Sequence, residues 1–363
     1  MIKQKKIIVV FSGPPIEQSS VIFEIQDGYE CWDLKKLKVD EFITLLKDRI
    51  PPINENILLR HYKSETESQD IYGITGKQYE DCSWALLIPE GLDSIVDSYS
   101  ETLFLLNLYS SKFLYPVFYA SNFGITRHKH EINILVFFHN QNQSDIFKTK
   151  EFVIFFKTLL PQSKYCHWQM DRVKKWGLED WRLHVAILLF DGLKEYEYSK
   201  SIFGWQRESA DMATILEALF TADDTQNEEV GYRLRKRIAV LLSWKITTIE
   251  KEIKKLYSQR SAFVHGSFFA QIAKDIKKDQ TDFPLPDFNF LYKQKEYVRL
   301  ALVAYLHLAN LISQKPAEYG DNKTVMAVLE TAVIDIELRN KIIEEISKLF
   351  SLMPEVGTSV LSQ

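Results

Sequence analysis

The stretch "LYSQRSAFVHGS", Leu256–Ser267, places an arginine, a histidine and a glycine within seven residues of a helical pattern. Apolar residues are interleaved between them, and Gly266 interrupts the pattern. Two interpretations of Arg260 and His265 follow. They are either ordinary helix residues with satisfied side chains, which is what an isolated pair at this spacing usually is, or the polar centre of a site.

The chemistry of the two side chains suits phosphate. The guanidinium of Arg260 is a fixed positive fork, and the imidazole of His265 exchanges protons near neutral pH. Together they suffice for RNA cleavage without a metal, because the arginine can stabilise a phosphorane. Five residues of an ideal helix turn by roughly 140°, so the side chains do not share a face. A distortion near Gly266, the reach of the arginine or a second copy of the chain would resolve this mismatch.

Helical patterns surround this stretch on both sides. Apolar periodicity predicts helices at 179–200, 206–222, 227–244, 247–272, 288–313 and 324–351. The segment 277–287 carries two prolines and is predicted to separate two long helices. The sequence therefore predicts an all-α domain over 179–352, followed by a loose tail at 353–363.

The first 160 residues have a different pattern. Runs rich in valine, isoleucine and phenylalanine predict strands at 6–12, 20–26, 55–63, 83–89 and 131–139, with helices at 93–111 and 149–159. Asp27-Gly28 is a strong hairpin signal. Residues 161–178 fit neither pattern and are predicted to be a linker. The expected fold class is α+β, with a mixed α/β domain over 1–160 that could sense a ligand or bind a partner.

Composition narrows the class of protein. The chain has 363 residues, 46% of them hydrophobic and 26% charged, with a formal net charge of −4. No run of about 18 apolar residues occurs, so no membrane helix is expected. Cys31, Cys82 and Cys166 lie far apart, which excludes a disulfide framework and favours the cytoplasm.

Other chemical signals are weak. "GITGKQ" (73–78) lacks the spacing of a phosphate loop and is typical of a turn. His128 and His130 would share a face of a strand, but no further ligand lies near them in the sequence. His184 and His307 lie in apolar helical patterns and are expected to be satisfied core residues. No metal and no cofactor is predicted.

The segment 227–260 is locally basic, with nine lysines and arginines against four glutamates. Such a patch is expected of a protein that binds a phosphate backbone. The alternative is a set of solvated helix faces, because Glu250 and Lys254 have the favourable i,i+4 order. The residues predicted to bind RNA are Arg233, Arg235, Arg237, Lys254 and Lys255.

The full string resembles the signature of the HEPN superfamily, in which an arginine is followed after four to six residues by a histidine. It is most similar to the ApeA-like HEPN branch, through Tyr257, the Arg260-Ser261 pair and the Val-His-Gly ending. "ILEALFTADD" (215–224) resembles the earlier helix of that family and supplies Glu217. "RLRKRIAVLLS" (233–243) resembles the next helix. The likeness covers about residues 178–313.

This resemblance implies a helical bundle that forms a homodimer, with two Arg/His motifs facing each other. It implies a metal-independent endoribonuclease of phage defence or of a toxin–antitoxin system, with an antitoxin or trigger protein at the N-terminal domain. Arg260 would stabilise phosphate charge, His265 would transfer protons and Ser261 would position one of them. Glu217 and Tyr257 would support the site. The alternative is a non-catalytic HEPN module that dimerises and binds a partner protein or a nucleotide.

Overall fold

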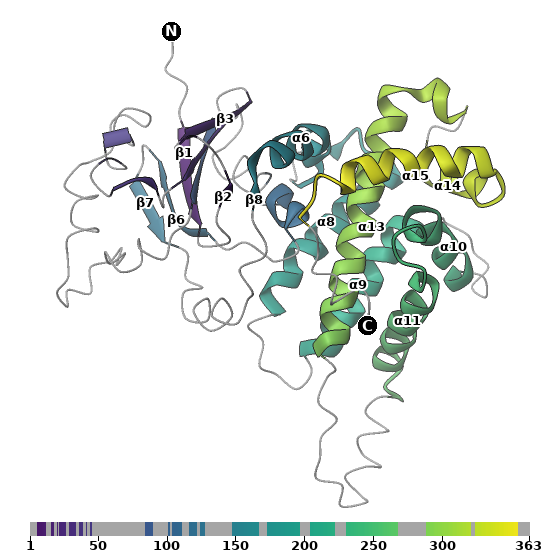
Figure 1. Cartoon of the computed structure of the whole chain (residues 1–363). Coiled ribbons are helices and arrows are strands. Elements are labelled where there is room, and N and C mark those ends of the chain that lie inside the picture. Colours follow the sequence, from purple (N-terminus) through teal and green to yellow (C-terminus); the bar gives the residue numbers. More distant parts are fainter. Residues whose placement is uncertain are drawn as a thin grey trace, which may run out of the picture. The chain divides into compact units, whose positions relative to one another are not determined.

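The computed structural model describes the residues in the following ranges: 6–11, 16–17, 20, 22–26, 29–33, 36–38, 41, 44–45, 84–89, 101, 104–110, 116–121, 124–127, 147–166, 173–196, 204–221, 230–267, 288–320 and 324–354. The chain forms two compact units, Met1–Lys157 with Leu352–Glu355, and Thr158–Ser351 with Val356–Gln363 (Figure 1). The predicted strands at 55–63 and 131–139 lie outside the described residues.

The first unit contains a sheet with the strand order β3-β4-β5-β1-β6-β7. All of its neighbouring strands pair antiparallel. The short strands β2 and β8 pair in parallel and form a second, two-stranded sheet. The bounds are β1 Lys6–Phe11, β2 Ile16–Glu17, β3 Ile22–Gln26, β4 Tyr29–Asp33, β5 Trp84–Pro89, β6 Pro116–Ser121, β7 Gly124–Arg127 and β8 Phe147–Lys148.

Three of the predicted strands coincide with β1, β3 and β5, and β3 pairs with β4 on either side of Asp27-Gly28, as the hairpin signal predicts. The sequence analysis missed β6 and β7, which are six and four residues long. Segments this short show little alternation, and it is their pairing with β1 and with each other that makes them strands.

The described core of the first unit is aromatic. Residues 104–109 are helical and buried, within the predicted helix 93–111. The Tyr109 ring meets Phe152 and Phe155 edge-on, at centroid distances of 5.1 and 5.2 Å. Both phenylalanines belong to α6, Thr149–Leu159, which has the predicted bounds. Edge-to-face aromatic pairs of this kind add to the stabilisation from burial.

The second unit is helical. Its elements are η2 Leu160–Cys166, α8 Leu178–Tyr196, α9 Gly204–Phe220, α10 Val230–Leu242, α11 Ile249–Val264, α13 Phe288–Gln314, η3 Pro316–Tyr319, α14 Val325–Ile334 and α15 Ile336–Phe350. Residues 297–308 of α13 are buried on every side, and α13 contacts α9, α10, α11, α14 and α15 (Figure 1). The predicted all-helical character of this part is confirmed. In the described residues, no helix has the length and apolar character needed to cross a membrane.

Two aromatic residues of the predicted linker at 161–178 contact α8. Tyr165, in the 3₁₀ helix η2, is buried and donates its hydroxyl hydrogen bond to Asp180 of α8 at 2.5 Å. The Trp176 ring lies 5.1 Å from that of Trp181 and 5.0 Å from that of His184. Tyr165 and Trp176 thus pack against α8, a contact that the mixed composition of the segment did not predict.

The predicted helix 324–351 is two helices. Asp335 has an extended backbone between α14 and α15, and its side chain accepts a hydrogen bond from the N–H of Leu338 at 3.0 Å. Thr324 caps α14 in the same way through the N–H of Ala327, at 3.2 Å. Aspartate and threonine are good N-cap residues because their side-chain oxygens satisfy free N–H groups. The predicted tail at 353–363 lies largely outside the described residues.

Candidate functional site

Helix α11 carries the motif, and its buried positions explain its orientation. Ile249, Ile253 and Leu256 are buried at a helical spacing and hold one face of α11 against the bundle. The helix ends at Val264 rather than at the predicted residue 272. The last residues of the motif therefore lie at and beyond a helix end.

Gly266 is the reason for this end. Its φ is +71°, in the left-handed region that glycine adopts without a steric cost. The N–H of Gly266 donates to the carbonyl of Phe263 at 3.1 Å, and that of His265 donates to the carbonyl of Ser261 at 3.0 Å. These bonds satisfy the last carbonyls of the helix. His265 itself is exposed.

Arg260 reaches from α11 to the neighbouring helix α9. Its Nη2 donates to Oε2 of Glu217 at 3.3 Å, and the two side chains are 27% and 20% exposed. The guanidinium carbon lies 5.8 Å from the centroid of the Tyr257 ring, within the range of a cation–π contact. The structure thus brings together two residues of the motif and the glutamate that the sequence analysis placed beside them.

Tyr257 completes this arrangement, because its hydroxyl also hydrogen-bonds to Glu217. Burial and the nearby carboxylate of Glu217 raise the pKa of Tyr257, so that its hydroxyl keeps its proton and donates at neutral pH. We call Glu217, Tyr257 and Arg260 the arginine cluster. It is a half-buried carboxylate that receives two donors, one of them cationic.

His265 and Ser261 take different places. Ser261 is half-buried, and its carbonyl is the acceptor that holds the N–H of His265. The imidazole of His265 is exposed at the end of α11, whereas Arg260 points to α9. This agrees with the rotation expected between positions five residues apart. Within one chain, the arginine cluster and His265 are neighbours in sequence that face different surroundings.

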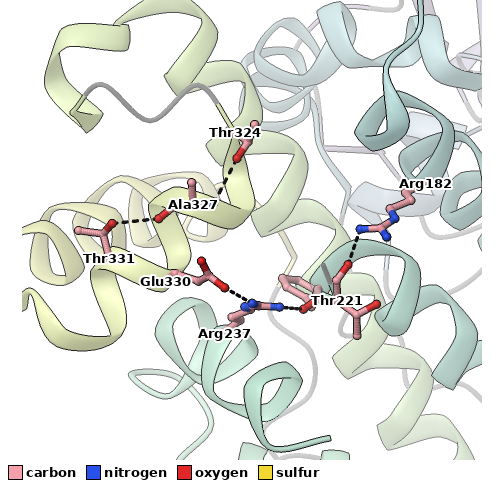
Figure 2. A network of polar contacts seen from close by, with 8 residues as sticks. Arg182, Thr221, Arg237, Thr324, Ala327, Glu330 and Thr331 are labelled. Atoms are coloured by element: carbon pink, nitrogen blue, oxygen red, sulfur yellow. Dashed lines mark hydrogen bonds and ion pairs between the residues drawn. The ribbon is translucent and has the colours of Figure 1, made fainter. Parts of the chain in front are cut away.

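The end of α9 that carries Glu217 is fixed by two arginines (Figure 2). Arg182 of α8 donates to the carbonyl of Thr221 at 2.5 Å, and Arg237 of α10 donates to the carbonyl of Phe220 at 2.6 Å. Arg237 also forms an ion pair with Glu330 of α14. Positive groups at a helix C-terminus satisfy free carbonyls and complement the helix dipole.

The prediction that Arg237 binds RNA is therefore wrong. Its side chain is only 3% exposed and it is bonded on both sides, so it cannot meet a phosphate. The sequence analysis also missed Arg182, which has no motif around it. Contacts between residues 39 positions apart, such as Arg182 with Thr221, follow from the packing of α8 on α9.

The other basic residues lie nearer the surface. Lys254 and Lys255 are exposed on α11, and Arg233 and Arg235 are half-exposed on α10. Lys255 pairs with Glu252 at 3.0 Å. Glu250 pairs with Lys236 of α10 at 3.0 Å, rather than with Lys254 as the helical order suggested.

His184 and His307 are both buried, as predicted, but Nδ1 of His307 has no hydrogen-bond partner in the part of the chain that the structure describes. His184 is buried and its Nδ1 donates to the carbonyl of Tyr165 at 2.6 Å. His307 is also buried, and burial lowers its pKa to about 4. The described residues hold no group of three or more histidine, cysteine or carboxylate side chains placed for a metal. "GITGKQ", His128 and His130 lie outside the described residues.

Comparisons with family models, with curated proteins and with solved structures find no match to this chain.

Proposed function

We propose that this chain is a metal-independent endoribonuclease of the HEPN type, acting in phage defence or as a toxin. The single observation that carries the proposal is the ion pair of Arg260 with Glu217, five residues before the exposed His265 at the glycine-ended terminus of α11. An exposed histidine and a positioned arginine, brought together by a second copy of the chain, are the minimum needed to move a proton and stabilise a phosphorane.

The chemistry balances with these groups alone. The 2′-oxygen of a ribose attacks the adjacent phosphorus while His265 accepts its proton, and the bond from phosphorus to the 5′-oxygen breaks. The leaving 5′-oxygen then takes this proton from the imidazolium of His265. Arg260 stabilises the charge of the phosphorane. The products are a 2′,3′-cyclic phosphate and a 5′-hydroxyl.

Glu217 and Tyr257 act as positioning residues in this proposal. A guanidinium has five N–H donors, and the contact with Glu217 engages Nη2. The carboxylate fixes the orientation of Arg260 while other N–H groups can meet phosphate oxygens. Ser261, which follows the arginine, would position a proton through its hydroxyl.

The product ends test this function directly. We expect the purified chain to cleave single-stranded RNA in the presence of a chelator, to leave 2′,3′-cyclic phosphate and 5′-hydroxyl ends, and to leave DNA intact. DNA lacks the attacking hydroxyl. Mass spectrometry of the fragments reads the ends. Ends with a 5′-phosphate, or cleavage that persists in His265→Ala, would contradict the mechanism. The matched control is Asn340→Ala, on the exposed side of α15, which should cleave RNA as the wild-type chain does.

One observation favours the second candidate, a non-catalytic HEPN module that dimerises and binds a partner protein or a nucleotide. Arg260 already has a carboxylate partner, which a purely structural arginine would also have. The two candidates differ in the histidine, since among the described residues the exposed His265 is bonded only through its backbone N–H. Loss of RNA cleavage in His265→Ala without loss of dimer would decide for the enzyme.

A further inference from the structure

An exposed aromatic side chain lies among the basic residues of α10 and α11. Tyr232, in the first turn of α10, is 55% exposed. Lys236 lies one turn further along, with Nζ 5.5 Å from the centroid of the tyrosine ring. The sequence analysis counted the lysines and arginines of this segment but not the aromatic residue between them.

Two contacts fix how α10 and α11 lie against each other. Lys236 pairs with Glu250 at 3.0 Å, and a Cβ atom at Gly231 would lie 3.8 Å from the Tyr257 ring. Position 236 of α10 therefore lies beside position 250 of α11, and position 231 lies beside position 257. The helices run antiparallel, and Tyr232 is level with the segment 254–256.

From that level, exposed and polar positions continue toward the motif. Lys254, Ser258 and Ser261 recur at helical spacing and share one face of α11, and His265 follows at its end. Ten residues of helix separate Lys254 from the last helical residue, Val264, which is about 15 Å along the axis. A short single strand can span this distance.

We propose that Tyr232 stacks against an unpaired base of the RNA substrate, with Lys254 at the neighbouring phosphate. The inference rests on the proposed ribonuclease function and names the form of its substrate, a single strand. Exposed aromatic rings within a basic surface are what proteins use to bind single strands, since every base has a face that can stack. In a double-stranded RNA these faces are covered by neighbouring bases.

The occupant is an RNA rather than a protein because of the charges around the ring. Lys236, Lys254 and Lys255 lie at or next to the level of Tyr232. Glu250 forms an ion pair with Lys236, and Glu252 forms one with Lys255. The exposed lysine at position 254 provides the positive charge that a phosphate needs.

The test measures binding without cleavage. The probe is a short 2′-O-methyl oligoribonucleotide, which has no free 2′-hydroxyl and cannot be cut, and its affinity for the full chain is read by fluorescence anisotropy. We expect Tyr232→Ala to bind about tenfold more weakly. Tyr232→Phe and Tyr232→Trp should keep the affinity, because each retains a ring.

Tyr292 offers a matched control. It is 47% exposed at the start of α13, and Lys295 lies 6.0 Å from its ring, so it copies the local chemistry of Tyr232 on another helix. We expect Tyr292→Ala to bind the probe as the wild-type chain does. A duplex of the same sequence should not distinguish Tyr232→Ala from the wild type.

Three results would overturn the stacking role: no binding of the probe by the wild-type chain, equal affinity in Tyr232→Ala, or a changed oligomeric state of Tyr232→Ala by light scattering, which would assign the ring to a protein interface. The outcome is separable from the nuclease test. Ring-dependent binding by a chain that cleaves no RNA would support the stacking role and contradict the proposed ribonuclease.

Discussion

At the scale of single residues, the two polar residues of "LYSQRSAFVHGS" differ in whether they look structural or functional. Arg260 is partnered and half-buried, as a structural residue would be, whereas His265 is exposed, as a group that meets a substrate would be. This exposure sets how much stability the chain loses when either side chain is removed. An ion pair that is open to solvent contributes about 0–1 kcal/mol, and an exposed imidazole contributes less.

The first prediction follows from these exposures. Arg260→Ala and His265→Ala should both remain folded, with free energies of unfolding within about 1 kcal/mol of the wild type. RNA cleavage should fall at least about a hundredfold in each, the usual effect of losing a general acid or base. Urea unfolding and a cleavage assay on the same preparations measure the two effects. A marked loss of stability in both variants would instead favour the structural interpretation of the motif.

The second prediction concerns pH and His307. Burial lowers its pKa to about 4 in the folded chain, from 6.5 for an ordinary histidine, and Glu345 opposes this effect only in part. Between these values the unfolded chain binds a proton that the folded chain does not. Stability is therefore complete above about 6.5 and falls as the pH is lowered towards 4, by up to about 1.4 kcal/mol per pH unit from this residue.

The measurement for His307 is urea unfolding over this pH range for the wild type and His307→Gln. The glutamine variant has no group that titrates at this position, so its stability should depend less on pH. Parallel curves for the two proteins would show that another group dominates. His184 is not a suitable comparison, because its Nδ1 is bonded to the carbonyl of Tyr165.

At the scale of elements, the important unit is the end of α9. Arg182 from α8 and Arg237 from α10 bond the last carbonyls of α9 (Figure 2). One turn earlier, Glu217 pairs with Arg260 of α11. Thr221 adds a bond from its hydroxyl to the carbonyl of Glu217 at 2.5 Å. The position of the arginine cluster thus depends on a helix end that is held from outside.

The third prediction tests this anchor. Arg237→Met should lower the free energy of unfolding by about 1–3 kcal/mol, because it leaves the buried carbonyl of Phe220 without its donor. Arg235→Met, two residues earlier and half-exposed, should change stability by less than about 0.5 kcal/mol. Chemical denaturation of both variants gives the comparison. Equal effects would mean that Arg237 is not the anchor of α9.

At the scale of the whole molecule, the central fact is that the side chains of Arg260 and His265 point in different directions. The helix end at Val264 does not turn His265 towards α9, so one chain does not bring the two side chains to a common face. Val264 is 55% exposed beside the histidine. An exposed valine next to a candidate proton-transfer group is consistent with a site that a second copy completes.

The fourth prediction is a homodimer through the helical unit, with each site using Arg260 of one chain and His265 of the other. Light scattering should give the mass of a dimer at micromolar concentration. Mixing Arg260→Ala chains with His265→Ala chains should restore part of the activity, since a mixed dimer contains one intact site. A monomer with full activity, or mixtures as inactive as the separate variants, would contradict this arrangement.

Much of the architecture could be predicted from the sequence alone. The helical character after residue 178, the hairpin at Asp27-Gly28 and the bounds of α6 follow from periodicity and turn chemistry, which act between near neighbours. The motif of Arg260 and His265 is equally local. So is the helix end at Gly266, whose left-handed backbone explains why the regular pattern stops there.

Only the tertiary structure decided which of these residues have partners. The burial of Arg237, the pairing of Glu250 with Lys236 and the packing of Tyr165 on α8 each join residues from different elements. Composition counted Arg237 with the surface cations because a sequence shows charge but not depth. The physical reason is that burial and ion pairing depend on which helix faces meet, and this is set by the packing of the whole bundle.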